Sequence, residues 1–241
     1  MKLILNGILA IFFFIGCSTQ PKSEKIDRHA LVERNNVLID QYEPLASLSV
    51  GNGEFAFTTD ITGLQTFFKD YESGVPLGTL SDWGWHTLPN TEDFKYSETY
   101  KYYEIEGRQV PFSHQIKNNA RKKAACNYFR ENPHRLHLGI IGFVLTKKDG
   151  TPATINDIKN PKHHLDMWTG QITAEFEFDG QPVKVETFCH QKQDQVSAKI
   201  ESSLIASGQL AIQWEFPYGA PVHCGPGYDF NSPDKHQTVM E

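Results

Sequence analysis

The sequence lacks the features that mark several large classes of protein. It contains no apolar run near the roughly 20 residues that a membrane-spanning helix needs. It also contains no long basic run of the kind that follows a phosphate backbone, and its net charge is −6. The short cluster Arg121-Lys122-Lys123 fits a solvated helix face. We therefore expect no nucleic-acid partner.

Patterns that bind metals or supply nucleophiles are missing as well. The chain has four cysteines and no Cys-x-x-Cys, His-Glu-x-x-His or Gly-x-Ser-x-Gly string. His134 and His137, three residues apart, would face opposite sides of a strand, and the adjacent His163 and His164 would point apart in the same way. We expect neither a metal nor a cofactor.

The start of the chain has the pattern of an export signal. Lys2 precedes an apolar run over 8–15, so we interpret 1–16 as a signal peptide. The string Phe14-Ile15-Gly16-Cys17 resembles a bacterial lipobox, with Phe14 where Leu is usual. That resemblance implies lipid attachment at Cys17 and an exported protein anchored to the cell envelope, with the outer membrane expected and the face left open. An ordinary export signal with an unmodified Cys17 is the alternative.

The polar segment 17–27 is typical of a tether, and a single domain is expected over 28–241. Beyond Cys17, the remaining cysteines are Cys126, Cys189 and Cys224. Three thiols allow at most one disulfide bond, and the pairing stays open.

Alternating apolar residues predict antiparallel strands. The clearest case is a hairpin in which 172–178 and 183–187 flank the turn Asp179-Gly180. Similar runs cover 48–57, 196–200 and 210–216. The spacing of these runs favours a mainly β fold, a large antiparallel β-sandwich.

Helix is scarce in the sequence. The best candidate covers 118–130 and ends before Asn132-Pro133, where proline discourages continuation. A shorter one follows Thr154, and 228–241 closes no strand or helix. We therefore expect only a few short helices.

Several strings in order along the chain resemble one family. They are Ser47–Phe57, Asp60–Phe67, Gly74–Thr79, Ser81–His86, Asn132–Gly139 and Glu186–His190. Together they resemble the amino-terminal region of six-hairpin glycosidase-like proteins, which are related in plan to the glycoside hydrolase family 65 group. The resemblance covers nearly all of the chain from Arg28 onward.

The resemblance implies a galactose-mutarotase-like supersandwich that precedes an (α/α)6 barrel with the catalytic carboxylates. That barrel needs hundreds of residues beyond Glu241, so no catalytic residue is carried over and the chain alone should be inactive. The expected function is the non-catalytic domain of a membrane-anchored glycoside hydrolase or phosphorylase in carbohydrate metabolism. The alternatives are a stand-alone carbohydrate-binding lipoprotein and a small complete glycosidase.

The string Ser81–His86 is the candidate substrate-binding segment for an oligo- or polysaccharide. Trp83 and Trp85 are predicted to share one face of an extended segment, with Gly84 between them leaving room for a sugar ring. Asp82 and His86 would hydrogen-bond sugar hydroxyls. The competing interpretation places both indoles in the core or against the barrel.

Glycoside hydrolysis needs two carboxylates about 5 Å or about 6.5–9.5 Å apart. Glu54, Asp60, Asp70 and Asp82 lie near the aromatic segment, but no spacing brings any two of them together. We expect surface charges or turn formers, and Asp60 before Thr62 suits a turn.

Overall fold

A computed structural model describes residues 25–220 and 227–239. The predicted signal peptide, Cys17 and all but the last three residues of the predicted tether lie outside this part of the chain. The fold is mainly β and built from antiparallel sheets, as the sequence predicts. Among the described residues, no helix is long and apolar enough to cross a membrane.

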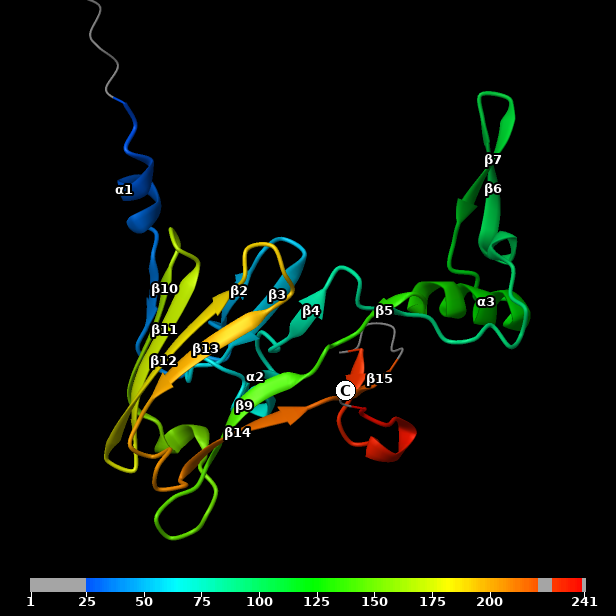
Figure 1. Cartoon of the computed structure of the whole chain (residues 1–241). Helices are drawn as coiled ribbons and strands as arrows, with labels where there is room; N and C mark the ends of the chain where they lie inside the picture. The colour runs from blue at the N-terminus through cyan, green and yellow to red at the C-terminus, as the bar shows by residue number, and fades with distance from the viewer. Residues whose placement is uncertain (1–24, 221–226, 240–241) are drawn as a thin grey trace, which may run out of the picture.

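One layer is a five-stranded antiparallel sheet (Figure 1). The predicted hairpin lies at its centre, where Asp179 (φ 52°) and Gly180 (φ 75°) form the two-residue turn. Two positive φ angles match the twist of the flanking strands. In sheet order the strands are β1 (Val37–Ile39), β10 (Lys159–Asp166), β11 (Gln171–Phe178), β12 (Gln181–Cys189) and β13 (Val196–Glu201).

Two smaller sheets pack over the inner face of this layer. Gln65 links them, because its backbone N–H donates to the Ile141 carbonyl (2.8 Å) and its side-chain amide donates to the Thr58 carbonyl (3.0 Å). Phe57 and Phe178, at most 1% exposed, pack in the core that the layers enclose. One sheet pairs β14 (Leu210–Glu215) with β9 (Ile140–Leu145), and the other has the order β2 (Leu48–Gly51), β3 (Phe55–Thr59), β4 (Thr79–Ser81).

The turn after β3 brings the layers into close contact. Gly63 has φ +79°, and a Cβ there would lie 2.9 Å from the Cβ of Ala174. The Thr187 hydroxyl donates to the Gly63 carbonyl at 2.7 Å. A residue without a side chain is therefore needed for backbone from one layer to reach the other.

A separate arm projects from the sandwich (Figure 1). It holds the predicted helix, which Asn119 caps through its side chain, and a hairpin that the sequence did not predict. Arg121 ties the helix to the 3-10 turn that precedes the hairpin, by donating to both carboxylate oxygens of Glu98, at 2.8 and 2.9 Å. The arm's elements are η1 (Tyr96–Thr99), β6 (Tyr100–Ile105), β7 (Arg108–Ser113) and α3 (Ala120–Glu131).

Short elements complete the fold. The helix predicted after Thr154 is a 3-10 turn, and the expectation of no strand or helix over 228–241 is wrong, because a short strand and a 3-10 turn form there. The elements are α1 (Arg28–Glu33), α2 (Phe68–Tyr71), β5 (Trp85–His86), β8 (His134–Arg135), η2 (Ile155–Asp157), β15 (Tyr218–Gly219), β16 (Tyr228–Asp229) and η3 (Pro233–Lys235).

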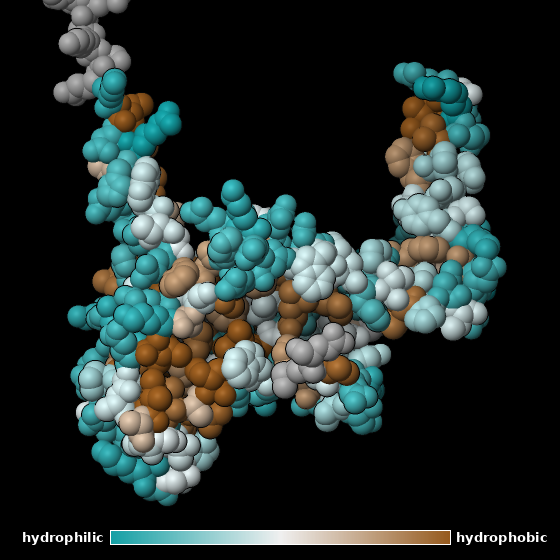
Figure 2. Space-filling view, viewed as in Figure 1, coloured by the Kyte–Doolittle hydropathy of each residue, from teal (hydrophilic) through white to brown (hydrophobic). Residues whose placement is uncertain are grey.

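One side of the sandwich is open, between the edge strands β13 and β14. Trp214 alternates with the core residue Leu210 and so lies on the core-facing side of β14, yet it is 62% exposed. Ala198 on β13 pairs with the buried Thr187 and is also exposed. Figure 2 shows apolar surface gathered on this side of the molecule. Apolar core-facing residues without cover are a mark of an interaction surface.

Candidate functional site

The candidate segment is a tight turn, so the predicted extended geometry is wrong. The Gly84 N–H donates to the Ser81 carbonyl (3.2 Å), and the Trp85 N–H donates to the Trp83 carbonyl (2.8 Å). β4 ends at Ser81 and β5 begins at Trp85. The two tryptophans are therefore not alternate residues of one strand. Gly84 is buried, and a Cβ there would lie 3.3 Å from Leu138, so its space serves packing within the protein.

Both indoles lie on the surface. Trp83 is 65% exposed and Trp85 is 50% exposed, so neither belongs to the core. The other two tryptophans, Trp168 and Trp214, are 52% and 62% exposed. Tryptophan normally buries most of its large apolar area, so two exposed indoles two residues apart in the sequence suggest a binding surface. We call the surface of Trp83 and Trp85 the tryptophan platform.

A carboxylate that the sequence analysis missed fixes the orientation of Trp83. The indole Nε1 donates to Oδ2 of Asp194 at 2.7 Å, and the Ser81 hydroxyl donates to the same oxygen at 2.5 Å. The hydrogen bonds from Ser81, Trp83 and Asn52 lower the pKa of Asp194 below its usual range. Trp83 and Asp194 are 111 residues apart in the sequence, so no local pattern could have joined them.

Asn52 holds the loop that carries Asp194 against the platform. Its side-chain nitrogen donates to the carbonyls of His190 (3.4 Å) and Gln193 (3.2 Å). Its side-chain oxygen accepts from the backbone N–H of Glu54 (2.9 Å) and Phe55 (2.8 Å). The Gly-Asn-Gly turn between β2 and β3 therefore supports the site.

Arg135 covers one part of the Trp85 ring. Trp85 and Arg135 are partners in the β5–β8 pair, and the guanidinium carbon lies 4.7 Å from the ring centroid. Such a cation–π contact contributes about 0.5–1 kcal/mol at an exposed site. Each indole of the platform, one before and one after Gly84, therefore contacts a polar partner.

His86 forms a hydrogen-bonded pair with His134. The two rings meet at 3.2 Å between Nδ1 of His86 and Nε2 of His134, and Nδ1 of His134 contacts the Glu131 carbonyl at 3.1 Å. A carbonyl only accepts, so His134 carries its proton on Nδ1, and His86 donates from its own Nδ1. Burial lowers the pKa of His134, and the neighbouring charge of His86 adds to this. In the neutral pair, Nε2 of His86 is an acceptor of the kind that binds a sugar hydroxyl.

The nearby carboxylates do not form a catalytic pair. Asp82 and Glu54 are exposed, and the Asp82 N–H donates to the Glu54 carbonyl at 2.8 Å. Asp60 shapes a turn, as predicted, but it is fully buried in the protein. Within residues 25–220 and 227–239, no group of three or more His, Cys, Asp or Glu side chains is placed to hold a metal ion.

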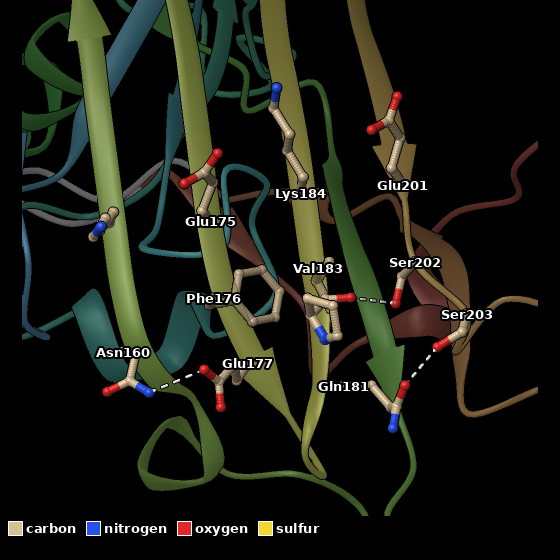
Figure 3. A pocket seen from close by; sticks show the side chains of 12 residues that line it. Asn160, Glu175, Phe176, Glu177, Gln181, Val183, Lys184, Glu201, Ser202 and Ser203 are labelled. Atoms are coloured by element: carbon tan, nitrogen blue, oxygen red, sulfur yellow. Dashed lines mark hydrogen bonds between the residues drawn. The ribbon is translucent and has the colours of Figure 1, made fainter.

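A hollow with apolar residues in its lining lies elsewhere, over the outer face of β10–β13 (Figure 3). Its volume is about 640 Å³, and charges of both signs line it. Many of its polar groups already bind one another. Asn160 donates to Glu177 (3.1 Å), Ser202 to the Pro182 carbonyl (2.8 Å) and Ser203 to Gln181 (2.9 Å). We interpret this hollow as the solvated face of the sheet.

Replacing Asp194 by Ala should release the Trp83 indole, because the acceptor for its N–H is lost. We expect the indole N–H resonance of Trp83 to move upfield and to exchange faster with solvent in NMR spectra. Asp149→Ala is the control, because Asp149 binds only its own turn. An unchanged Trp83 resonance in Asp194→Ala would rule out the positioning role.

No family model matches the sequence, and no curated protein matches it.

Proposed function

We propose that this chain is the non-catalytic β-sandwich domain of a membrane-anchored glycoside hydrolase or phosphorylase, and that its tryptophan platform contacts an oligo- or polysaccharide. The observation that carries the proposal is the pair of exposed indoles at Trp83 and Trp85, each held by a polar partner. A pyranose ring has an apolar face that packs on an indole. An indole that is already fixed loses little conformational entropy on binding.

Polar groups around the platform supply the directional part of sugar recognition. Asp82 is exposed next to Trp83 and accepts hydrogen bonds as a carboxylate. His86 offers its Nε2 as a further acceptor in the neutral histidine pair. A sugar hydroxyl donates to either group while the ring stacks on an indole. This combination of a few placed polar groups beside apolar surface is typical of ligand sites.

The open side of the sandwich supports membership of a larger enzyme. The core-facing Trp214 and Ala198 are exposed there, and a large uncovered apolar surface fits contact with another domain. The resemblance to six-hairpin glycosidase-like proteins supplies the identity of that domain, an (α/α)6 barrel. We further propose that a lipid on Cys17 anchors the protein to the cell envelope.

A stand-alone carbohydrate-binding lipoprotein is the second candidate. The exposed platform favours it, whereas the open apolar side of the sandwich favours the larger enzyme. The two candidates differ in the size of the native product. An immunoblot of the membrane fraction of the source cells should give a band several times the mass of this chain if the barrel is part of the protein. A band at the mass of this chain would favour the stand-alone lipoprotein.

The double variant Trp83→Ala, Trp85→Ala should bind oligosaccharides at least tenfold more weakly than the unchanged chain, a loss of about 1.4 kcal/mol. The fold should survive, because both side chains are exposed. Affinity electrophoresis through gels that contain neutral polysaccharides measures the effect.

Trp168→Ala is the matched control, because Trp168 is equally exposed and lies on the β10–β11 turn, outside the platform. Equal binding by the double variant and the unchanged chain would overturn the proposed platform. Glycoside hydrolysis that falls in Asp82→Asn or Glu54→Gln would instead support the small complete glycosidase.

A further inference from the structure

Arg135 is a cation at the platform without a carboxylate partner among the described residues. Among the ion pairs of those residues, one involves an arginine, the pair of Arg121 with Glu98, and none involves Arg135. Arg135 is exposed, and its contact with Trp85 is through the ring face. The carboxylate that is hydrogen-bonded to the platform is that of Asp194, and it accepts from Ser81 and Trp83.

The way that Arg135 is held leaves its hydrogen-bond donors available. The guanidinium carbon lies over the Trp85 ring, and none of the side-chain hydrogen bonds of the described residues uses one of the five N–H donors of Arg135. Those groups match the two oxygens of a carboxylate in a bidentate geometry. The contact with the Trp85 ring also limits the motion of the side chain, so less entropy is lost when an anion binds.

We infer that the sugar at the platform is an acidic one, whose carboxylate binds Arg135 while a pyranose ring packs on Trp83 or Trp85. This inference rests on the proposed function and names the chemical class of its ligand, a uronic-acid-containing oligosaccharide. Asp82 and Asp194 are the opposing charges at this surface. Asp194 already accepts from Ser81 and Trp83, and Asp82, exposed beside Trp83, would accept from sugar hydroxyls. Lysine at position 135 would not replace arginine, because an ammonium lacks the bidentate geometry.

Two probes that differ only in charge test this inference. The full chain in detergent is titrated with tetragalacturonate and with its methyl ester, which has the same rings and no carboxylates. We expect the acid to bind at least tenfold more tightly than the ester. Arg135→Gln should abolish the preference for the acid, so that the two probes bind with equal affinity, and Arg135→Lys should recover little of that preference.

Arg130→Gln is the charge-matched control, because Arg130 donates to Gln115 on the arm, outside the platform. Trp83→Ala should weaken both probes. Equal affinities for acid and ester, both lost in Trp83→Ala, would overturn the acidic ligand and leave the proposed function standing. If neither probe binds, the acidic ligand is also overturned, and the neutral polysaccharides decide the proposed function.

Discussion

Replacing Asp60 by Ala should lower the free energy of unfolding by about 4 kcal/mol, because three buried donors lose their acceptor together. Oδ1 of Asp60 accepts from the backbone N–H of Thr62 (2.7 Å) and from its hydroxyl (2.5 Å), and Oδ2 accepts from the N–H of Phe67 (2.6 Å). Asp60 is 0% exposed, so water does not replace the lost bonds. Urea denaturation followed by circular dichroism measures the change.

The chain contains a matched control for this experiment. Asp149 makes the same two bonds to Thr151, to its N–H (2.9 Å) and its hydroxyl (2.6 Å), in an exposed turn. Asp149→Ala should have a far smaller effect, because water satisfies the freed donors there. Similar losses in the two variants would show that burial of Asp60 is not what makes its turn important.

Acid should destabilise the protein through His163 by about 3 kcal/mol between pH 7 and pH 4. His163 is 1% exposed, and its Nε2 bonds the Thr59 hydroxyl at 3.1 Å. Burial lowers the pKa of His163 to about 4. The unfolded chain, with the ordinary pKa of about 6.5, therefore takes up a proton before the folded protein does, and stability falls as the pH drops through this window.

Asp60 acts in the opposite direction over the same range. Burial raises the pKa of Asp60 to about 6, above the value of 3.8 that it has when exposed, although hydrogen bonds from Phe67 and Thr62 lower it. The folded protein therefore takes up this proton first, which adds about 2 kcal/mol of stability by pH 4. In the unchanged chain the two groups largely cancel.

The variant His163→Gln separates the two effects, because glutamine keeps a donor for Thr59 and does not titrate. We expect the stability of the unchanged chain, relative to His163→Gln, to fall by about 3 kcal/mol from pH 7 to pH 4. Urea midpoints at a series of pH values measure this difference. A constant difference across the range would show that His163 titrates normally in the folded protein.

Local patterns predicted the elements whose causes are local. The β11–β12 hairpin follows from strict alternation and from Asp179-Gly180, whose positive φ angles make a two-residue turn. α3 follows from the Asn119 cap and ends before Pro133. In both cases neighbours in the sequence supply the decisive contacts.

The sequence could not predict contacts between residues far apart in the chain, or strands that have no buried face. The hairpin β6–β7 is exposed on both faces, so its residues show no alternation between apolar and polar. Asp194 reaches the platform through a loop held by Asn52. The sequence itself indicated Asp82, Trp83, Trp85 and His86 as the candidate residues. It did not predict the turn that they form, because β5 pairs with β8, and His86 and His134 are 48 residues apart in the sequence.

The most direct test of the platform is the NMR spectrum of the four tryptophan indole N–H groups during titration with oligosaccharides. The chain has four tryptophans, so the spectrum contains its own controls, and single Trp→Phe variants assign each resonance. We expect saturable shifts of the Trp83 and Trp85 resonances, with those of Trp168 and Trp214 unchanged. Saturable shifts confined to Trp168 or Trp214, or no shift with any neutral or acidic oligosaccharide, would contradict the proposal that Trp83 and Trp85 bind sugar.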